Sequence, residues 1–222
     1  MADIRTAHVT VPRTARYAAF GPPPGEADEW WIAFHGYGQL AAAFAEQCAA
    51  LDNGRRLVVA PEALSRFYQG DLIGSAGDRR VGASWMTRED REHEITDYLR
   101  YLDHLLASLC DAVATPPPVH VLAFSQGTAT ASRWVASGRV RAVRLVCWGG
   151  LIAPELEITS PSAPLRGTRV QLVLGLRDQF ATPERVAAER ARLDEAELPY
   201  EVITFDGGHR LDHATLARIA SA

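Results

Sequence analysis

The chain has 222 residues, of which 47% are hydrophobic and 23% are charged, and its formal net charge is −4. This is the composition of a globular protein with room for one substantial core, so we expect a single domain over residues 1–222. The weak negative charge gives no reason to expect nucleic acid or an acidic membrane as a partner. Every basic residue is an arginine, which excludes chemistry that requires a Schiff-base lysine or a phosphate-loop lysine.

Localisation signals and metal motifs are not visible in the sequence. The first residues contain no apolar segment of a signal peptide, and no run of 18 apolar residues occurs, so we expect a cytoplasmic protein without a membrane span. Cys48, Cys110 and Cys147 are scattered without a C-x-x-C pair, which favours reduced, buried thiols. We therefore expect no disulfide framework, no metal site and no cofactor.

Taken in chain order, the sequence alternates between short apolar runs and helical patterns. Residues 8–20 predict an N-terminal edge hairpin, with strands at 8–11 and 16–20 around a Pro-Arg-Thr turn. Buried parallel strands are then predicted at residues 30–34, 57–60, 119–124, 143–148, 169–174 and 200–205. Helical patterns occupy the intervals, the clearest at residues 89–110. The alternation predicts an α/β fold, with a mostly parallel twisted sheet of about seven strands and helices on both faces.

One connection is longer than its neighbours. Residues 62–86 are glycine-rich and irregular, and connections of this length are usually functional or mobile. We interpret the segment as a lid or pocket wall. We expect its large apolar side chains to line a substrate pocket, with ordinary packing as the alternative; these residues are Phe67, Tyr68, Leu72 and Trp85.

The most informative stretch is residues 119–129, where an apolar strand leads to Ser125 and then to an alanine-rich helical segment. Strand, sharp turn and helix form the context of a nucleophile elbow, in which a strained turn holds the serine above the sheet edge. Such turns require small residues two positions before and after the serine. Here these positions hold Ala123 and Gly127, and the alanine departs from the usual glycine by one methyl group.

A serine nucleophile needs a base, a carboxylate to orient the base, and hydrogen-bond donors for the oxyanion. Asp178 and His209 are the candidates for carboxylate and base, each just past a predicted strand. The rivals are Asp206, in a sequence typical of a turn, and His213, one helical turn further on. The segment 35–38 (His-Gly-Tyr-Gly) follows another strand and is the candidate oxyanion loop. Open α/β sheets place their sites at these strand ends.

With these residues in place, the chain resembles the α/β-hydrolase superfamily, and within it the small phospholipase/carboxylesterase family that includes acyl-protein thioesterases. The matching motifs span most of the chain: Phe34 to Gly38, Pro61, Ala123 to Gly127, Gly175 to Phe180, and Gly207-Gly208-His209. Ala123 and Thr128 stand where the family has glycines.

The resemblance implies Ser125 as nucleophile, His209 as base and Asp178 as the residue that orients it. It also implies an oxyanion hole made by the backbone N–H groups of Tyr37 and Gln126. The expected function is hydrolysis of carboxylic esters or thioesters with small to medium acyl chains through an acyl-enzyme. The partner is then a small-molecule ester, and a homodimer is possible. Two alternatives stay open: a non-catalytic ligand-binding relative, because one fold hosts many functions, and a peptidase that uses the same three residues.

Overall fold

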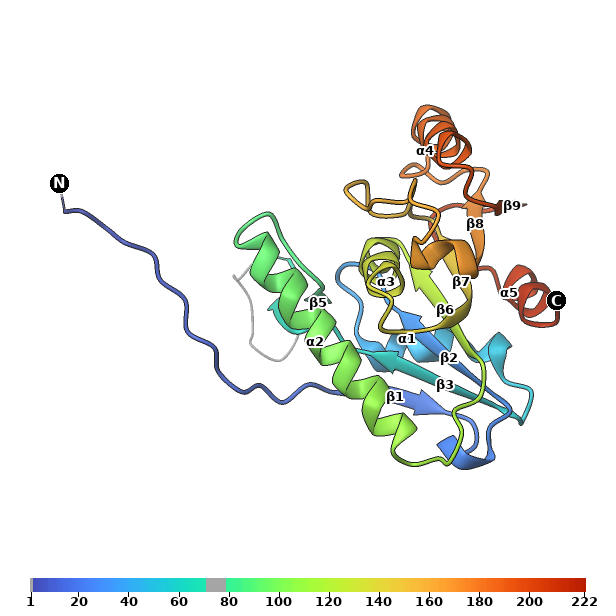
Figure 1. The fold of residues 1–222 in the computed structure, drawn as a ribbon, viewed down its shortest axis with the longest axis horizontal. Coiled ribbons are helices and arrows are strands. Elements are labelled where there is room, and N and C mark those ends of the chain that lie inside the picture. The colour runs from blue at the N-terminus through green and yellow to red at the C-terminus, as the bar shows by residue number, and fades with distance from the viewer. Residues whose placement is uncertain (1, 71–78) are drawn as a thin grey trace.

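The computed structural model describes residues 2–70 and 79–222, so Leu72 lies outside the described residues. Its centre is a seven-stranded sheet in the order β1-β3-β2-β6-β7-β8-β9 (Figure 1). The strands are β1 (Tyr17–Phe20), β2 (Glu29–Phe34), β3 (Arg56–Pro61), β6 (Val119–Phe124), β7 (Ala142–Trp148), β8 (Arg169–Gly175) and β9 (Tyr200–Phe205). All neighbouring pairs are parallel except β1 and β3. The predicted α/β class with a mostly parallel sheet is confirmed.

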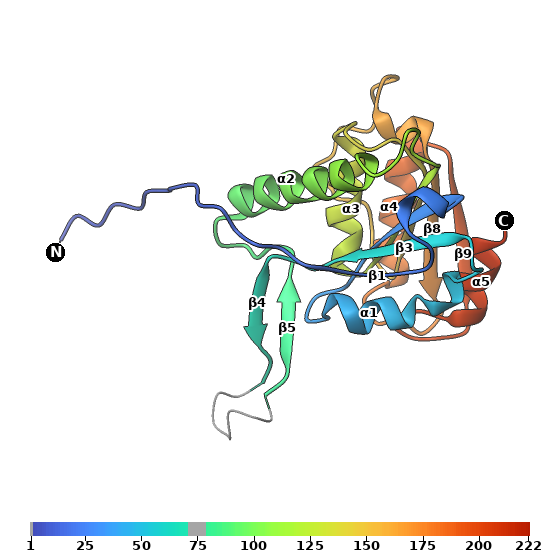
Figure 2. The same ribbon diagram turned by 90° about the horizontal axis from the view of Figure 1, so that it is seen from below.

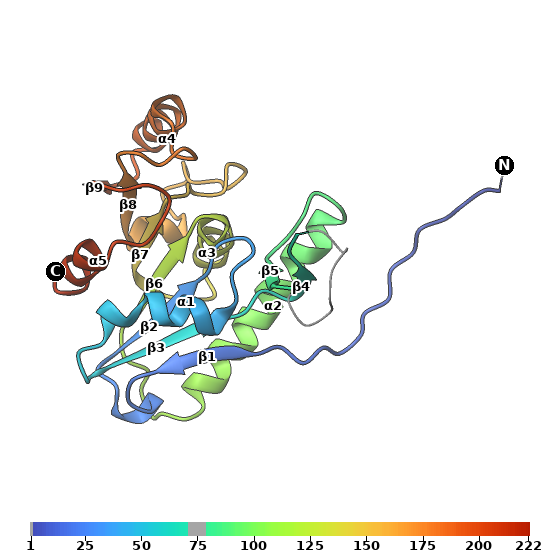
Figure 3. The same ribbon diagram turned by 180° about the vertical axis from the view of Figure 1, so that it is seen from behind.

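Helices cover both faces of the sheet. One face carries α2 (Arg91–Cys110), α3 (Gln126–Ala136) and α4 (Pro183–Glu195), as Figures 1 and 2 show. The other face carries α1 (Ala41–Gln47) and α5 (His213–Ala220), seen from behind in Figure 3. Short 3-10 turns cover Pro24–Glu26, Ala49–Leu51 and Pro164–Gly167. Among the described residues, no helix is both long enough and apolar enough to cross a bilayer.

Because helices cover both faces of the sheet, the strand sequences are apolar throughout. All six residues of β6 are buried, because its alternate side chains enter the two cores on opposite sides of the sheet. In α2 the buried residues recur every three or four positions, so a single stripe faces the sheet. They are Tyr98, Leu102, Leu105 and Leu109.

The sheet has the predicted antiparallel edge near the N-terminus, but this edge is not a local hairpin. Only the second half of the predicted hairpin is a strand, and β1 pairs antiparallel with β3, from Tyr17 opposite Pro61 to Phe20 opposite Val58. Residues 8–11 form no strand, and Val9 and Val11 are 84% and 67% exposed. The apolar edge of β3 offers β1 a buried partner, whereas a local hairpin would leave both strands without a core to cover.

The 62–86 connection contains two short strands, β4 (Ser65–Tyr68) and β5 (Val81–Ser84). They pair antiparallel. This β4–β5 hairpin projects away from the sheet (Figure 2). One side of the hairpin is bonded to the loop after β2. Gly38 N donates to Ala83 O over 2.8 Å, and Gln69 Nε2 donates to Gly38 O over 2.5 Å.

The side chain of Glu62 joins segments that are distant in the sequence. Its carboxylate is almost fully buried and accepts hydrogen bonds from Arg16 Nε over 2.7 Å and Arg66 Nε over 2.6 Å. It also accepts from Ala41 N, at the start of α1, over 3.1 Å. Burial alone would raise the pKa of Glu62, but these hydrogen bonds outweigh burial, so the pKa lies below its ordinary value of 4.5.

We predict that Glu62→Gln lowers the free energy of unfolding at pH 7 by about 1 to 2 kcal/mol, since an amide cannot accept all the charged hydrogen bonds. Because the pKa of Glu62 is lowered in the folded state, its stabilisation is complete above the unfolded-state pKa and is lost as the pH falls through the folded-state pKa. Urea denaturation at pH 7 and at pH 3 should therefore show a smaller difference between wild type and variant at pH 3. A difference that does not depend on pH would contradict this account.

Candidate active site

Ser125 lies directly after β6 and directly before α3. Its backbone has φ of +53° and ψ of −117°, a region that residues other than glycine rarely adopt. The turn is held by the neighbouring strand, because Ser125 N donates to Trp148 O over 2.9 Å. Thr128, one turn into α3, donates its hydroxyl to Ser125 O over 2.7 Å. The elbow predicted from the sequence is therefore present in its strained form.

Position 127 requires glycine for a different reason from the one that the sequence pattern suggests. A Cβ atom added there would lie 2.7 Å from the carbonyl oxygens of both Phe34 and His35. The constraint therefore comes from the end of β2, which is the neighbour of β6 in the sheet. Because α3 must begin against that strand end, only glycine fits.

The structure brings Ser125, His209 and Asp178 together. His209 Nε2 lies 2.8 Å from Ser125 Oγ, and His209 Nδ1 lies 2.7 Å from Asp178 Oδ2. The carboxylate is also fixed through Oδ1, which accepts from Phe180 N over 2.9 Å. Since an ionised carboxylate only accepts, Nδ1 carries the proton and Nε2 is left to accept the serine hydroxyl proton. The Asp178 side chain is 1% exposed and that of His209 is 19% exposed.

The rival residues lie elsewhere. Asp206 is exposed and pairs with Arg177 rather than with a histidine. His213 is the exposed first residue of α5. His35 is fully buried, and it accepts from Ala63 N and contacts Gly36 O over 2.8 Å. Burial lowers the pKa of His35, so it is a neutral structural residue behind the candidate oxyanion loop.

The loop after β2 lies against the elbow. A Cβ added to Gly36 would be 3.2 Å from Ser125 Cβ, so the two segments touch. The N–H groups on either side of Tyr37 are occupied, by Gln39 Oε1 at Gly36 and by Ala83 O at Gly38. In the described part of the chain, the N–H groups of Tyr37 and Gln126 have no protein acceptor. Two free donors at this position are what an oxyanion hole requires.

The side chain of Gln126 fastens the elbow to the segment that follows the β4–β5 hairpin, a role that the sequence analysis missed. Its Oε1 accepts from Trp85 N over 3.1 Å, and its Nε2 donates to Met86 O over 2.9 Å. Nε2 also lies 3.2 Å from Ser84 Oγ. Since the hairpin is bonded to Gly38 as well, it is attached next to both free donors. Sequence pattern gives no signal for such a side-chain bridge.

Gly149 is a second residue that sequence reasoning missed. It follows β7 with φ of +60°, and an added Cβ would lie 3.1 Å from Asp178 Oδ2 and from the His209 ring. The backbone of Gly149 therefore packs directly against one side of the Asp178–His209 contact. The signal was available, because Gly149-Gly150 follows a predicted strand at the same sheet edge as the other candidates.

Of the four predicted pocket residues, Leu72 is not described and Trp85 is not at the surface. The Trp85 side chain is 2% exposed, and its indole N–H donates to His35 O over 2.9 Å. It packs on Phe34 next to the candidate oxyanion loop, and it can be buried because its N–H finds a buried partner there. Phe67 is half-buried, with its ring 5.1 Å from that of Tyr37, and Tyr68 is 54% exposed.

Two exposed aromatic side chains lie on loops that contact the candidate triad. Tyr37 is 60% exposed and Phe180 is 51% exposed. The Phe180 ring lies edge-on to that of His209, 4.6 Å away, and Phe124 lies on His209 at 4.7 Å. The imidazole is thus held between two aromatic rings, one of which also faces solvent.

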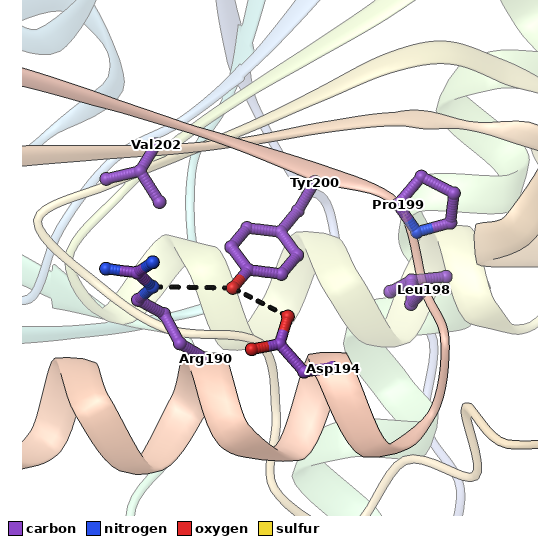
Figure 4. A pocket seen from close by; sticks show the side chains of 6 residues that line it. All are labelled: Arg190, Asp194, Leu198, Pro199, Tyr200 and Val202. Carbon is purple, nitrogen blue, oxygen red and sulfur yellow. Dashed lines mark hydrogen bonds between the residues drawn. The ribbon is translucent and has the colours of Figure 1, made fainter.

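A separate surface hollow lies between α4 and the start of β9, whereas His209 follows the end of β9 (Figure 4). Its polar groups bond to one another: Tyr200 Oη donates to Asp194 over 2.9 Å, and Arg190 Nε donates to Tyr200 Oη over 3.4 Å. The hollow is therefore at the other end of β9 from the candidate triad.

Comparisons with known proteins show which family and fold the chain shares. The model of the serine hydrolase (FSH1) family matches residues 30–215. Acyl-protein thioesterase 2 from Zea mays superposes with a TM-score of 0.69 at 16% identity, covering 94% of this chain and 97% of that one. A carboxylesterase from Mesorhizobium loti superposes with a TM-score of 0.68 at 16% identity, covering 94% and 95%. The structure of YahD with malic acid gives a TM-score of 0.67 at 10% identity, covering 94% and 97%. No curated protein matches by sequence.

At these identities the solved structures show the fold alone, which is that of the α/β-hydrolases. The family model covers 186 residues of the 222 (30 to 215 inclusive) and all of the site candidates. The chain is therefore a member of the FSH1 serine hydrolase family.

Proposed function

We propose that the protein hydrolyses carboxylic esters or thioesters with small to medium acyl groups through a covalent acyl-enzyme. The observation that carries this proposal is the continuous chain of hydrogen bonds from Ser125 through His209 to Asp178 beside two free backbone donors. The exposed apolar surface of Phe180, which packs on His209, suits an uncharged acyl or alcohol group better than a charged one.

The proposed mechanism follows from the direction of these hydrogen bonds. Ser125 Oγ attacks the carbonyl carbon while His209 Nε2 takes the hydroxyl proton. The new imidazolium is held by Asp178, and the oxyanion is held by the N–H groups of Tyr37 and Gln126. His209 then gives its proton to the leaving alcohol or thiol. Water repeats the sequence on the acyl-enzyme and releases the acid and free Ser125.

Substitution tests the proposed nucleophile and base. We expect Ser125→Ala and His209→Ala each to lower kcat/KM for p-nitrophenyl butyrate by at least about 10³-fold, because each removes a reacting group. A fluorophosphonate should add once to the wild type and not to either variant, as read by intact mass. Asp206→Asn and His213→Ala are the matched controls and should keep both properties. If the wild type takes no label, the ligand-binding alternative takes the place of this proposal.

The close packing at Gly149 can be tested by adding one methyl group. We expect Gly149→Ala to lower kcat by about tenfold or more, since the added methyl group pushes on Asp178 and His209 at their contact. Gly54→Ala is the control: Gly54 also has a positive φ, of +76°, but has open space around it. Both variants should lose about 1 kcal/mol of stability from backbone strain. Equal activity in the two variants would show that Gly149 does not constrain the site.

The Gln126 side chain positions the elbow and does not touch the reacting atoms. We expect Gln126→Leu to lower kcat by about tenfold with little change in KM, because the backbone donor stays but its anchorage to residues 84–86 is lost. Gln171→Leu, a buried change toward the amino end of β8, is the control and should leave kcat unaltered. Thermal unfolding of both variants separates this effect from a loss of stability. A drop in Tm with unchanged kcat would assign Gln126 a purely structural role.

A further inference from the structure

A cluster of three ligand-type side chains lies outside the active site. His8, in the N-terminal segment (residues 2–16), approaches Asp90 and His93 at the start of α2. His8 Nε2 is 3.1 Å from both carboxylate oxygens of Asp90, and His93 Nδ1 is 2.8 Å from Asp90 Oδ1. Residues 8 and 90 are 82 positions apart in the sequence, so the cluster is a tertiary contact.

Two of the three donors are held in place by the helix. The N–H groups of His93 and Glu94 donate to Asp90 O over 3.1 and 3.2 Å, so Asp90 and His93 lie on the same side of the first turn. An aspartate side chain is ionised at neutral pH, so Asp90 offers a negatively charged ligand oxygen between the two histidines. The nearby Arg91 is directed away from the cluster, toward Glu92 and Glu155.

The spacing of the donor atoms fits a small divalent ion. All three lie within 4.8 Å of one another. With zinc–ligand bonds of roughly 2.0–2.2 Å, neighbouring ligand atoms in a tetrahedral site are about 3.3 Å apart. The two imidazole rings are stacked 4.0 Å apart, so they must splay to point their lone pairs at one ion. Both side chains are about half exposed, at 48% and 58%, so this rotation disturbs no core packing.

We propose that His8, Asp90 and His93 bind a divalent transition-metal ion, with zinc the best match, and that this ion fastens the N-terminal segment to α2. Two imidazoles and one carboxylate suit zinc and its neighbours, whereas calcium and magnesium prefer oxygen ligands alone. Water completes the coordination, since the cluster is open to solvent. The site is independent of the proposed hydrolase chemistry.

Zinc chloride titrated calorimetrically into protein without a histidine tag tests the binding. We expect one zinc ion per chain to bind the wild type, and His8→Ala and Asp90→Asn each to weaken that event at least tenfold. His104→Ala is the control, because His104 is an exposed histidine further along α2. Magnesium and calcium should not compete. Equal zinc isotherms for wild type and His8→Ala would overturn the proposal, since any zinc bound at His209 or elsewhere would be common to both.

Limited trypsin digestion tests the fastening. Arg5 and Arg13 flank His8 in the sequence, so cleavage at these arginines reports how firmly the N-terminal segment is held. Zinc should slow cleavage of the wild type at both positions several-fold, as followed by intact mass. His8→Ala under the same zinc concentration should be cut at its zinc-free rate, which also controls for any effect of zinc on trypsin. Cleavage of the wild type that zinc does not slow would refute the tether.

Discussion

The parallel pairing of β2 with β6 is the contact on which the site depends. Phe34 lies opposite Ala123 in this pair, so the two strands end side by side. After β2 the chain turns toward α1 on one face of the sheet, and after β6 it turns toward α3 on the other. The two segments therefore diverge at the strand ends, which is where open α/β sheets place their ligand sites. Ser125 and the loop of Gly36 and Tyr37 meet at this point because Gly127 carries no side chain.

The fold and the candidate triad were predictable because each depends on local signals. Buried parallel strands are apolar along their whole length, and Ser125, Asp178 and His209 each follow one of them. Since the carboxyl ends of parallel strands share one edge, residues far apart in the sequence could be expected to meet. The order of serine, aspartate and histidine along the chain added independent support.

Other features depend on contacts that have no local signal. The pairing of β1 with β3 was missed because pattern alone favours the nearest partner, and the true partner is about 40 residues away. Trp85 was expected to line a pocket, with ordinary packing as the alternative, and it lies in the core because its indole N–H finds a buried carbonyl there. The bridge made by Gln126 and the approach of His8 to α2 join side chains whose neighbours are set by tertiary structure.

The attachment of the β4–β5 hairpin has a consequence for how substrate preference is expressed. The hairpin is hydrogen-bonded to Gly38 and, through residues 84–86, to Gln126, so it forms one unit with the two proposed oxyanion donors. A favourable contact between the hairpin and a distant part of an ester then does more than bind the ester. In the proposed mechanism it also steadies the two proposed oxyanion donors, so that recognition of the remote group appears in turnover rather than in affinity alone.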